Sequence, residues 1–475
     1  MRRRGRLREL RRWLSDNLAF AVVASVVSLL FALSFLMEKE TVDDPGKVLR
    51  RRGGGRRLKI RFMSPGDARA EQAYKQLLRV FERENPDIEV EFIKPAEQRY
   101  SVFVTTQMAA GNAADVMFFE DELFPNFAEE GVFLPLDDFI RRENYDLSDF
   151  FPLGLQEFTH EGVLYGLPQG WGAIVLFYNR DLFRRFGLEW SDDWTWPEFV
   201  EVAKKLTRDL DGDGKIDIYG YQGKHNFHHA LVYIWSNGGE VLSPDKKTWT
   251  VDTPANRVAF RAWCDLWLKH GIQYQYGGEA EDAFAALSDP FLEGRVAITE
   301  RGPYYAEELR NFTRFRWGIG YHPKSPYTHR RITRYYGDGY VIWRGTRHPE
   351  AAWRLLKFLA GPVGQRMIAR LGRSIPARKS VAYSPVFDRP DTSWDEKRLL
   401  AAAEFCHLQP ITGYFFDFSR IVGQHYDQVF LRHESWNLKR ITPEECLRRI
   451  QRDLEKAAAR YEERRRSRRG GRYRR

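Results

Sequence analysis

The stretch LKIRFMSPGDARAEQAYKQLLRVFERENPDIEVEFI, residues 58–93, decides the fold class. Its first residues, LKIRFMS, alternate between apolar and polar side chains in the manner of a strand. A helix is predicted next, with Asp67 as its N-cap and with one apolar face formed by Tyr74, Leu77, Leu78 and Phe81. Pro86 marks the end of this helix, and DIEVEFI alternates again. Strand, helix and strand at this spacing form a βαβ unit, which predicts a parallel sheet with helices on both faces.

The same alternation continues along the chain. Helical patterns follow strand-like ones, and four of the clearest are WPEFVEVAKKLTRDL, TPANRVAFRAWCDLWLKHG, HPEAAWRLLKFLAGP and TPEECLRRIQRDLEKAAARYEE. We find no internal repeat. The folded part is therefore expected to be α/β throughout, and 475 residues suggest two or three domains' worth of core.

The N-terminus predicts a membrane anchor. Residues 18–37 form 20 consecutive uncharged residues, long enough to cross the hydrocarbon core as a helix. Seven arginines precede this segment and acidic residues follow it, so residues 1–17 are expected in the cytoplasm and the rest of the chain outside. Residues 38–57 are expected to be a flexible linker. Cleavage of the segment as a signal peptide is the alternative, although its small-x-small site is weak.

The positive charge lies at the two ends of the chain. The net charge is +10, with +8 on residues 1–57 and +7 on residues 460–475, which leaves −5 on residues 58–459. Because a nucleic-acid binder needs a basic patch on its folded face, no nucleic-acid partner is expected. The Arg-rich residues 464–475 are predicted to be a disordered, solvated tail.

Cysteine usage and short motifs exclude several kinds of chemistry. The three cysteines, Cys264, Cys406 and Cys446, are too few and too widely spaced for a disulfide framework or a zinc site. The chain has no GxxxxGK[ST] phosphate loop, no HExxH motif and no GxSxG elbow. Nucleotide hydrolysis of the P-loop type, HExxH zinc chemistry and GxSxG nucleophilic catalysis are therefore not expected.

An aspartate-rich loop, RDLDGDGKIDIYGY at residues 208–221, follows the front half of a calcium-binding pattern. Its candidate ligands are Asp209, Asp211, Asp213 and Asp217. Gly220 stands where that pattern places a closing bidentate glutamate. The loop is thus either a structural Ca²⁺ site or a polar turn that uses Asp and Gly for turn chemistry alone.

Segments spread over about 400 residues resemble the family 1 extracellular solute-binding proteins of ABC importers, the group that includes maltose-binding protein. The resemblance runs from about Leu58 to Ala459. The segment that matches the family most clearly is GVLYGLPQGWGAIVLFYNRDLFRRFGL. Further segments in the family's order are WSNGGEVLSPD, FLEGRVAITERGPYY, YYGDGYVIWRG, AAWRLLKFLAGPVGQ and GRSIPARKSV. The resemblance also places the aspartate-rich loop in the second domain, away from the ligand.

This resemblance implies a two-lobed periplasmic-binding-protein fold, class II-like, whose lobes close on a ligand by hinge motion. Lobe one would comprise residues 58–169 and 322–376, and lobe two residues 175–320 and 377–463. The function implied is that of a monomeric carbohydrate receptor with no enzymatic activity and no required cofactor, which delivers its ligand to an ABC permease at the cell membrane.

Residues for stacking on sugar rings and for binding hydroxyl groups are expected in the cleft. By their positions in the family pattern they are Phe119, Glu120, Asp121, Trp171, Trp235, Arg301, Tyr304, Tyr305, Tyr336, Asp338, Tyr414 and Phe415. The alternatives are a membrane-tethered sugar-sensing module, an enzyme on a binding-protein scaffold, and a binder of another solute, such as a polyamine, a metal complex or a phosphodiester.

Overall fold

The computed structural model describes residues 57–96, 99–224, 226–274, 289–387, 396–410, 412, 414–430 and 439–472. The predicted βαβ unit is confirmed. Helix α2 (Ala68–Glu84) connects strands β1 (Leu58–Met63) and β2 (Ile88–Ile93), which pair in parallel. Asp67 caps α2, because its carboxylate accepts a hydrogen bond of 2.8 Å from the amide of Ala70.

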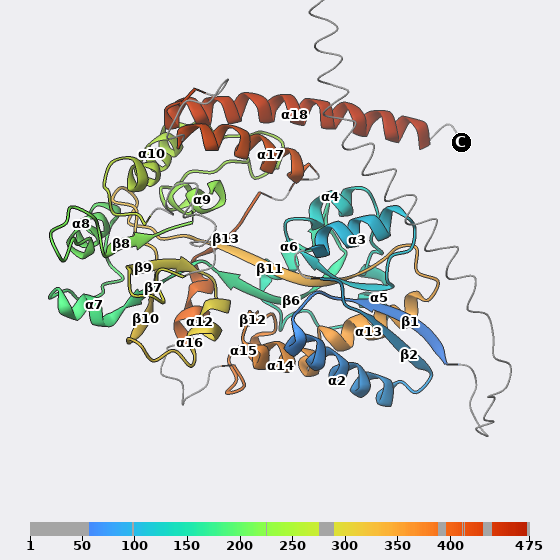
Figure 1. Cartoon of the computed structure of the whole chain (residues 1–475). Helices are drawn as coiled ribbons and strands as arrows, with labels where there is room; N and C mark the ends of the chain where they lie inside the picture. The colour runs from blue at the N-terminus through green and yellow to red at the C-terminus, as the bar shows by residue number, and fades with distance from the viewer. Residues whose placement is uncertain are drawn as a thin grey trace, which may run out of the picture. The chain divides into compact units, whose positions relative to one another are not determined.

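The larger sheet has seven strands in the described part of the chain, in the order β12-β6-β11-β3-β1-β2, with β13 paired to β11. Its other strands are β3 (Val116–Glu120), β6 (Gly166–Ala173), β11 (Thr333–Ile342), β12 (Ile375–Pro376) and β13 (Cys406–Leu408). Helices α2 and α14 (Pro362–Leu371) lie on one side of this sheet, and α3 (Tyr100–Ala109) and α4 (Phe124–Glu129) lie on the other (Figure 1). We call this sheet and its helices lobe one. Strand β13 belongs to this sheet, although its residues fall in the range predicted for lobe two.

The smaller sheet has four described strands in the order β10-β7-β9-β8, and with its helices it forms lobe two. These strands are β7 (Val175–Asn179), β8 (Tyr219–Gln222), β9 (Val296–Arg301) and β10 (Trp317–Gly320). The chain passes from one sheet to the other between β6 and β7, and returns between β10 and β11. A separate hairpin pairs β4 (Thr159–His160) with β5 (Val163–Leu164).

The remaining helices complete the two lobes. In the first part of the chain these helices are α3 (Tyr100–Ala109), α4 (Phe124–Glu129), α5 (Asp137–Glu143), α6 (Pro152–Glu157), α7 (Arg180–Arg185), α8 (Trp196–Leu206), α9 (Phe227–Ser236) and α10 (Pro254–Leu268). Those of the second half are α12 (Tyr304–Leu309), α13 (Pro349–Leu359), α14 (Pro362–Leu371), α15 (Lys379–Ala382), α16 (Glu396–Ala401), η3 (Ala402–Phe405), α17 (Phe415–Tyr426), η4 (Asp427–Val429) and α18 (Pro443–Arg472).

Each lobe has its own apolar core. In lobe one, the inward faces of β1, β3 and α2 bury side chains such as Phe62, Phe81 and Phe119. In lobe two, α9, α10, α17 and the first half of α18 pack together around Trp249 and Trp263. Cys264 and Cys446 are buried free thiols of this second core, and Cys406 is a half-buried free thiol.

The C-terminal helix is longer than the sequence predicts. Helix α18 continues through Arg472, whereas residues 464–475 were expected to be a disordered tail. Arginine is a good helix former, and two arginines of this segment have acidic partners: Arg464 pairs with Asp417, and Arg465 pairs with Glu129. These contacts extend the helix beyond its last apolar turn.

The predicted anchor at 18–37 lies outside the described residues, as do residues 1–17 and 38–56. Within the described ranges, no helix combines the length and the apolar character needed to cross a membrane.

Candidate functional site

The site begins where two neighbouring strands of lobe one meet. Strand β3 ends at Glu120 and continues into Asp121 and Glu122, so the sequence places three acids at its carboxyl end. Strand β11 runs antiparallel to β3, and its Asp338 lies directly opposite Glu120. A register shift between Asp338 and Gly339, on the side that pairs with β6, disrupts the regular ladder at this point.

Two adjoining cavities, each of about 470 Å³, lie between the lobes at these strand ends. Both are lined by Tyr304, Tyr336 and Asp338. The first cavity adds the acids after β3 and, from lobe two, Lys224 and Arg301. The second adds mainly groups of lobe one, which include Ser64, Tyr74, Phe118, Gln169, Trp171 and Arg373. The two volumes together fall in the range of small-ligand sites.

Aromatic rings and polar atoms alternate in the walls of these cavities. The ring of Trp171 stacks on Tyr335, with centroids 5.5 Å apart and planes 10° apart. The indole Nε1 of Trp171 and the hydroxyl of Tyr336 are buried, and neither has a hydrogen-bond partner among the described residues. Gly302 makes room for that hydroxyl, because a Cβ at this position would overlap it. Both atoms have almost no accessible surface, so a local movement would be needed before either could contact a molecule in the cavities.

The first cavity holds a concentration of negative charge. Arg334 pairs with Glu122 at 2.9 Å and with Asp121 at 3.4 Å. Gln409 also donates a hydrogen bond of 3.1 Å to Asp121. Burial nevertheless raises the pKa of Asp121 to about 7. Burial, together with the nearby charge of Asp121, also raises the pKa of Asp338 well above its usual value.

A further carboxylate lies behind the cavity wall. Glu157 is 2 % exposed, and its Oε1 accepts a hydrogen bond of 3.2 Å from the amide of Gly337. Its other oxygen has no partner within the described part of the chain. Burial raises the pKa of Glu157 well above its usual value, and Asp121 and Asp338 add to this effect.

Seven of the predicted ligand residues line the two cavities. They are Glu120, Asp121, Trp171, Arg301, Tyr304, Tyr336 and Asp338. Trp235 lies elsewhere, in a separate cavity of 280 Å³, where it stacks on His407 at 4.5 Å.

The other predicted residues are not brought to the cavities. Phe119 is fully buried in the core of lobe one, because it faces the opposite side of β3 from Glu120. Tyr305 is buried too, and its hydroxyl donates to Asp289 at 2.8 Å. Tyr414 lies in the core of lobe two, where it accepts a hydrogen bond from Trp249. Phe415 opens α17, and its side chain lies outside the described part of the structure.

Several lining residues were not predicted. Arg334 had a usable signal, because Arg334, Tyr336 and Asp338 alternate on one face of β11. No local sequence pattern marked Lys224 or Tyr74 as a site residue, since each reaches the cavities from an element far away in the sequence.

The aspartate-rich loop lies between α8 and β8 in lobe two, and none of its residues lines the cavities. Carboxylate oxygens of Asp209, Asp211 and Asp217 lie within 4.8 Å of one another, and Asp213 is not part of this group. Both oxygens of Asp209 accept loop amides, from Gly212 at 2.7 Å and from Gly214 at 2.9 Å. Three convergent carboxylates fit a Ca²⁺ ion, and the same hydrogen bonds fit an Asx-type turn.

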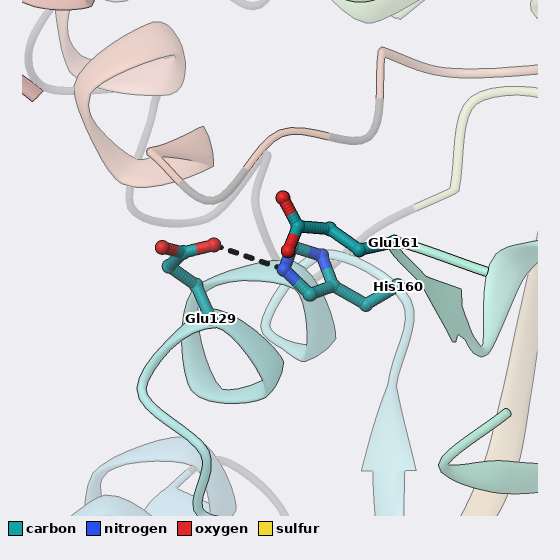
Figure 2. Close-up of side chains that lie close together, drawn as sticks. All are labelled: Glu129, His160 and Glu161. Atoms are coloured by element: carbon teal, nitrogen blue, oxygen red, sulfur yellow. Dashed lines mark hydrogen bonds and ion pairs between the residues drawn. The ribbon is translucent and has the colours of Figure 1, made fainter. Parts of the chain in front are cut away.

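A second group of acidic side chains forms ion pairs with Arg465, near the C-terminal end of α18. Figure 2 shows Glu129, from the end of α4, beside His160 and Glu161 of the β4–β5 hairpin. His160 Nε2 lies 2.9 Å from a carboxylate oxygen of Glu129. Arg465 of α18 pairs with both Glu129 and Glu161. The first half of α18 belongs to the core of lobe two, so this contact joins the two lobes (Figure 1).

Comparisons with known proteins agree with this geometry. The family described as bacterial extracellular solute-binding protein matches residues 65–366. The mannitol-binding protein of Pseudomonas aeruginosa is 28 % identical over 70 % of this chain and 74 % of its own length. The maltodextrin-binding protein MdxE of Bacillus subtilis is 23 % identical over 65 % and 72 %.

The fold has a counterpart among solved structures. The ABC substrate-binding protein Lmo0181 from Listeria monocytogenes, in complex with cycloalternan, superposes with a TM-score of 0.72. This superposition covers 85 % of the present chain and the whole of that chain, at 21 % identity. The likeness shows a two-lobed α/β substrate-binding fold.

Proposed function

Because the chain belongs to the bacterial extracellular solute-binding proteins, we propose that it is the substrate-binding component of an ABC importer. It binds a sugar or an oligosaccharide between its lobes and delivers it to the membrane permease. The names of its relatives, which bind maltodextrin and mannitol, support a polyhydroxylated ligand. The family consists of binding proteins, and we infer that this member has no catalytic activity of its own.

The observation that carries the proposal is the lining of the two cavities. Tyr304 and Tyr336 present aromatic faces suited to sugar rings. The carboxyl group of Asp338 lines both cavities, is partly exposed and can bind ligand hydroxyl groups.

The anchor belongs to the same proposal. A single-pass helix at residues 18–37 would hold the folded part outside the membrane, next to the permease, as a monomer. The positive residues before that segment support this orientation. Mass spectrometry of the N-terminus of membrane-extracted protein tests it, because a mature chain that begins after residue 37 would overturn the anchor.

A panel of ligands tests the function. Thermal melting of the full chain is measured with maltodextrins, mannitol, polyamines and phosphodiesters, since a ligand that binds only the folded state raises Tm. We expect a shift with at least one saccharide or sugar alcohol and no turnover of it. A shift only with polyamines or phosphodiesters would contradict a carbohydrate receptor.

A pair of tyrosine variants then locates the site. Tyr304→Ala removes a ring that both cavities share, and the affinity for the saccharide found in the panel should fall by about 10- to 100-fold. Tyr327→Ala is the matched control, because Tyr327 is 68 % exposed and lines neither cavity. Equal affinity of the two variants, measured by calorimetry, would place the ligand elsewhere.

A further inference from the structure

Asp338 has an unusual position at the junction of the two cavities. It lines both of them, and its side chain is partly accessible from them. Among the described residues, no hydrogen-bond donor and no cation pairs with its carboxylate. Removing a carboxylate from water is costly unless a donor or a cation compensates, and the raised pKa of Asp338 reflects this cost.

The surroundings of Asp338 add negative charge rather than positive charge. Glu120 lies opposite it across the strand pair, and Asp121 and Glu122 follow directly. The guanidinium of Arg334 is already paired with Asp121 and Glu122. The raised pKa of Asp338 has the same origin, namely burial and then the charges of these acids.

The positively charged side chains around the cavities either pair with other residues or line only one of the two cavities. Arg301 lies 3.7 Å from Asp289 and donates to the carbonyl of Glu300 and to Gln222. Lys224 lines the first cavity only, and Arg373, which pairs with Asp67, lines the second only. The junction that both cavities share is therefore lined by a carboxylate and two tyrosines.

A carboxylate flanked by aromatic rings is a recognition site for an ammonium group. The carboxylate supplies a charge-assisted hydrogen bond, and the ring of Tyr304 can add cation–π attraction, whereas the guanidinium of Arg334 already lies 5.9 Å from the ring centroid of Tyr336. A neutral sugar brings no cation to this junction, whereas an ammonium group beside Asp338 favours its ionised carboxylate over the protonated form.

We propose that the ligand is a saccharide that carries a protonated amine, an amino sugar, and that Asp338 binds its ammonium group. This inference rests on the proposed function and narrows its substrate class. The amine lies at the junction of the cavities, and the sugar rings extend from it along Tyr304 and Tyr336.

Matched pairs of saccharides test the proposal on the full chain. Calorimetry at neutral pH and low salt compares glucosamine with glucose, galactosamine with galactose, and a glucosamine disaccharide with cellobiose. The best amine ligand should bind at least about tenfold more tightly than its neutral partner. Added salt should reduce this preference, since a partly exposed charge pair is screened.

Asp338→Asn provides the second arm. It should remove the preference for the amine while neutral saccharides bind as well as to the wild type or better. Equal or tighter binding of the neutral partner to the wild type would overturn the amine inference and leave the carbohydrate receptor standing. If no saccharide of either kind bound, both proposals would fail. The wild-type comparison decides the question even where the variant does not fold.

Discussion

Asp217 and Gly220 lie three residues apart and show how single residues limit a sequence motif. The carboxylate of Asp217 converges with those of Asp209 and Asp211, as a calcium loop requires. Gly220 stands where a closing glutamate would complete the coordination, but a Cβ there would overlap the backbone carbonyl of Ala203 in α8. No side chain fits at that position, so packing of the loop's exit strand explains why the closing ligand is missing.

The loop leads to a prediction about stability. Calcium at about 100 times its Kd should stabilise the full chain by about 3 kcal/mol, and a chelator should reverse this, as measured by thermal melting. Saccharide affinity should not change, because the loop lines neither cavity. Asp217→Asn should abolish the calcium effect. Asp245→Asn, in an exposed turn of the same lobe, should retain it. A chelator that weakened saccharide binding without lowering Tm would contradict this role.

His322 makes the stability of lobe two sensitive to acid. It is 3 % exposed and lies 3.3 Å from Glu300. Burial lowers its pKa to about 4, although Glu300 opposes the effect. The unfolded chain, in which a histidine titrates near 6.5, then binds more protons between pH 6.5 and pH 4. The free energy of unfolding should therefore decrease as pH falls through this window.

A variant isolates this contribution. In His322→Gln, urea denaturation at a series of pH values should show a shallower pH dependence, by about 1–3 kcal/mol between pH 6.5 and 4. His348→Gln is the matched control for a histidine outside this network. The interpretation would be wrong if the two variants gave the same slope.

At the scale of elements, strand β11 organises the site. It pairs with β3 on one side and with β6 on the other, and Arg334, Tyr336 and Asp338 alternate along the face that meets the cavities. Strand β6 contributes Trp171 through the same sheet. The three cavity-lining side chains of β11 thus lie on one face of a strand that is hydrogen-bonded on both sides, which makes their spacing rigid.

The contact between β8 and α8 gives an element-scale prediction. Gly220→Ala should destabilise the protein by about 2–4 kcal/mol, because the new Cβ forces the strand away from the backbone of Ala203. Gly423→Ala is the matched control. It lies in α17 with open space around it and should be neutral or stabilising by up to about 1 kcal/mol, as measured by denaturant unfolding. Similar free energies of unfolding for the two variants would contradict the packing argument.

At the scale of the whole molecule, helix α18 connects the two lobes. Cys446, Leu447, Ile450 and Leu454 bury its first half in lobe two. Its far end reaches lobe one, where Arg465 pairs with Glu129 and Glu161 (Figure 2). Another ion pair between the lobes joins Arg69 of α2 with Glu307 of α12. Separation of the lobes must break both contacts, so they favour the arrangement in which the cavities exist.

Two adjacent arginines test this coupling. Arg465→Ala should weaken saccharide affinity by about 3- to 10-fold, because fewer molecules hold the binding-competent arrangement. Arg464→Ala is the matched control, since Arg464 pairs with Asp417 inside lobe two. Its affinity should stay within about twofold of wild type, because an exposed ion pair contributes little. Indistinguishable calorimetric affinities of the two variants would rule out a role for α18 in holding the lobes together.

The sequence by itself determined the elements and the family resemblance. Periodicity and capping depend on residues a few positions apart, and for this reason α2 with its Asp67 cap could be predicted without knowledge of the fold. The acids after β3 and the aromatic residues near the lobe crossings could be identified as site candidates for the same reason.

Only the tertiary structure decided which candidates line the cavities. Phe119 and Glu120 are neighbours on one strand and point to opposite sides, and Tyr304 lines both cavities while Tyr305 is buried against Asp289. The unpaired state of Asp338 depends on Arg334 being held by other acids. Such outcomes follow from contacts between segments far apart in the chain, which no local pattern of residues specifies.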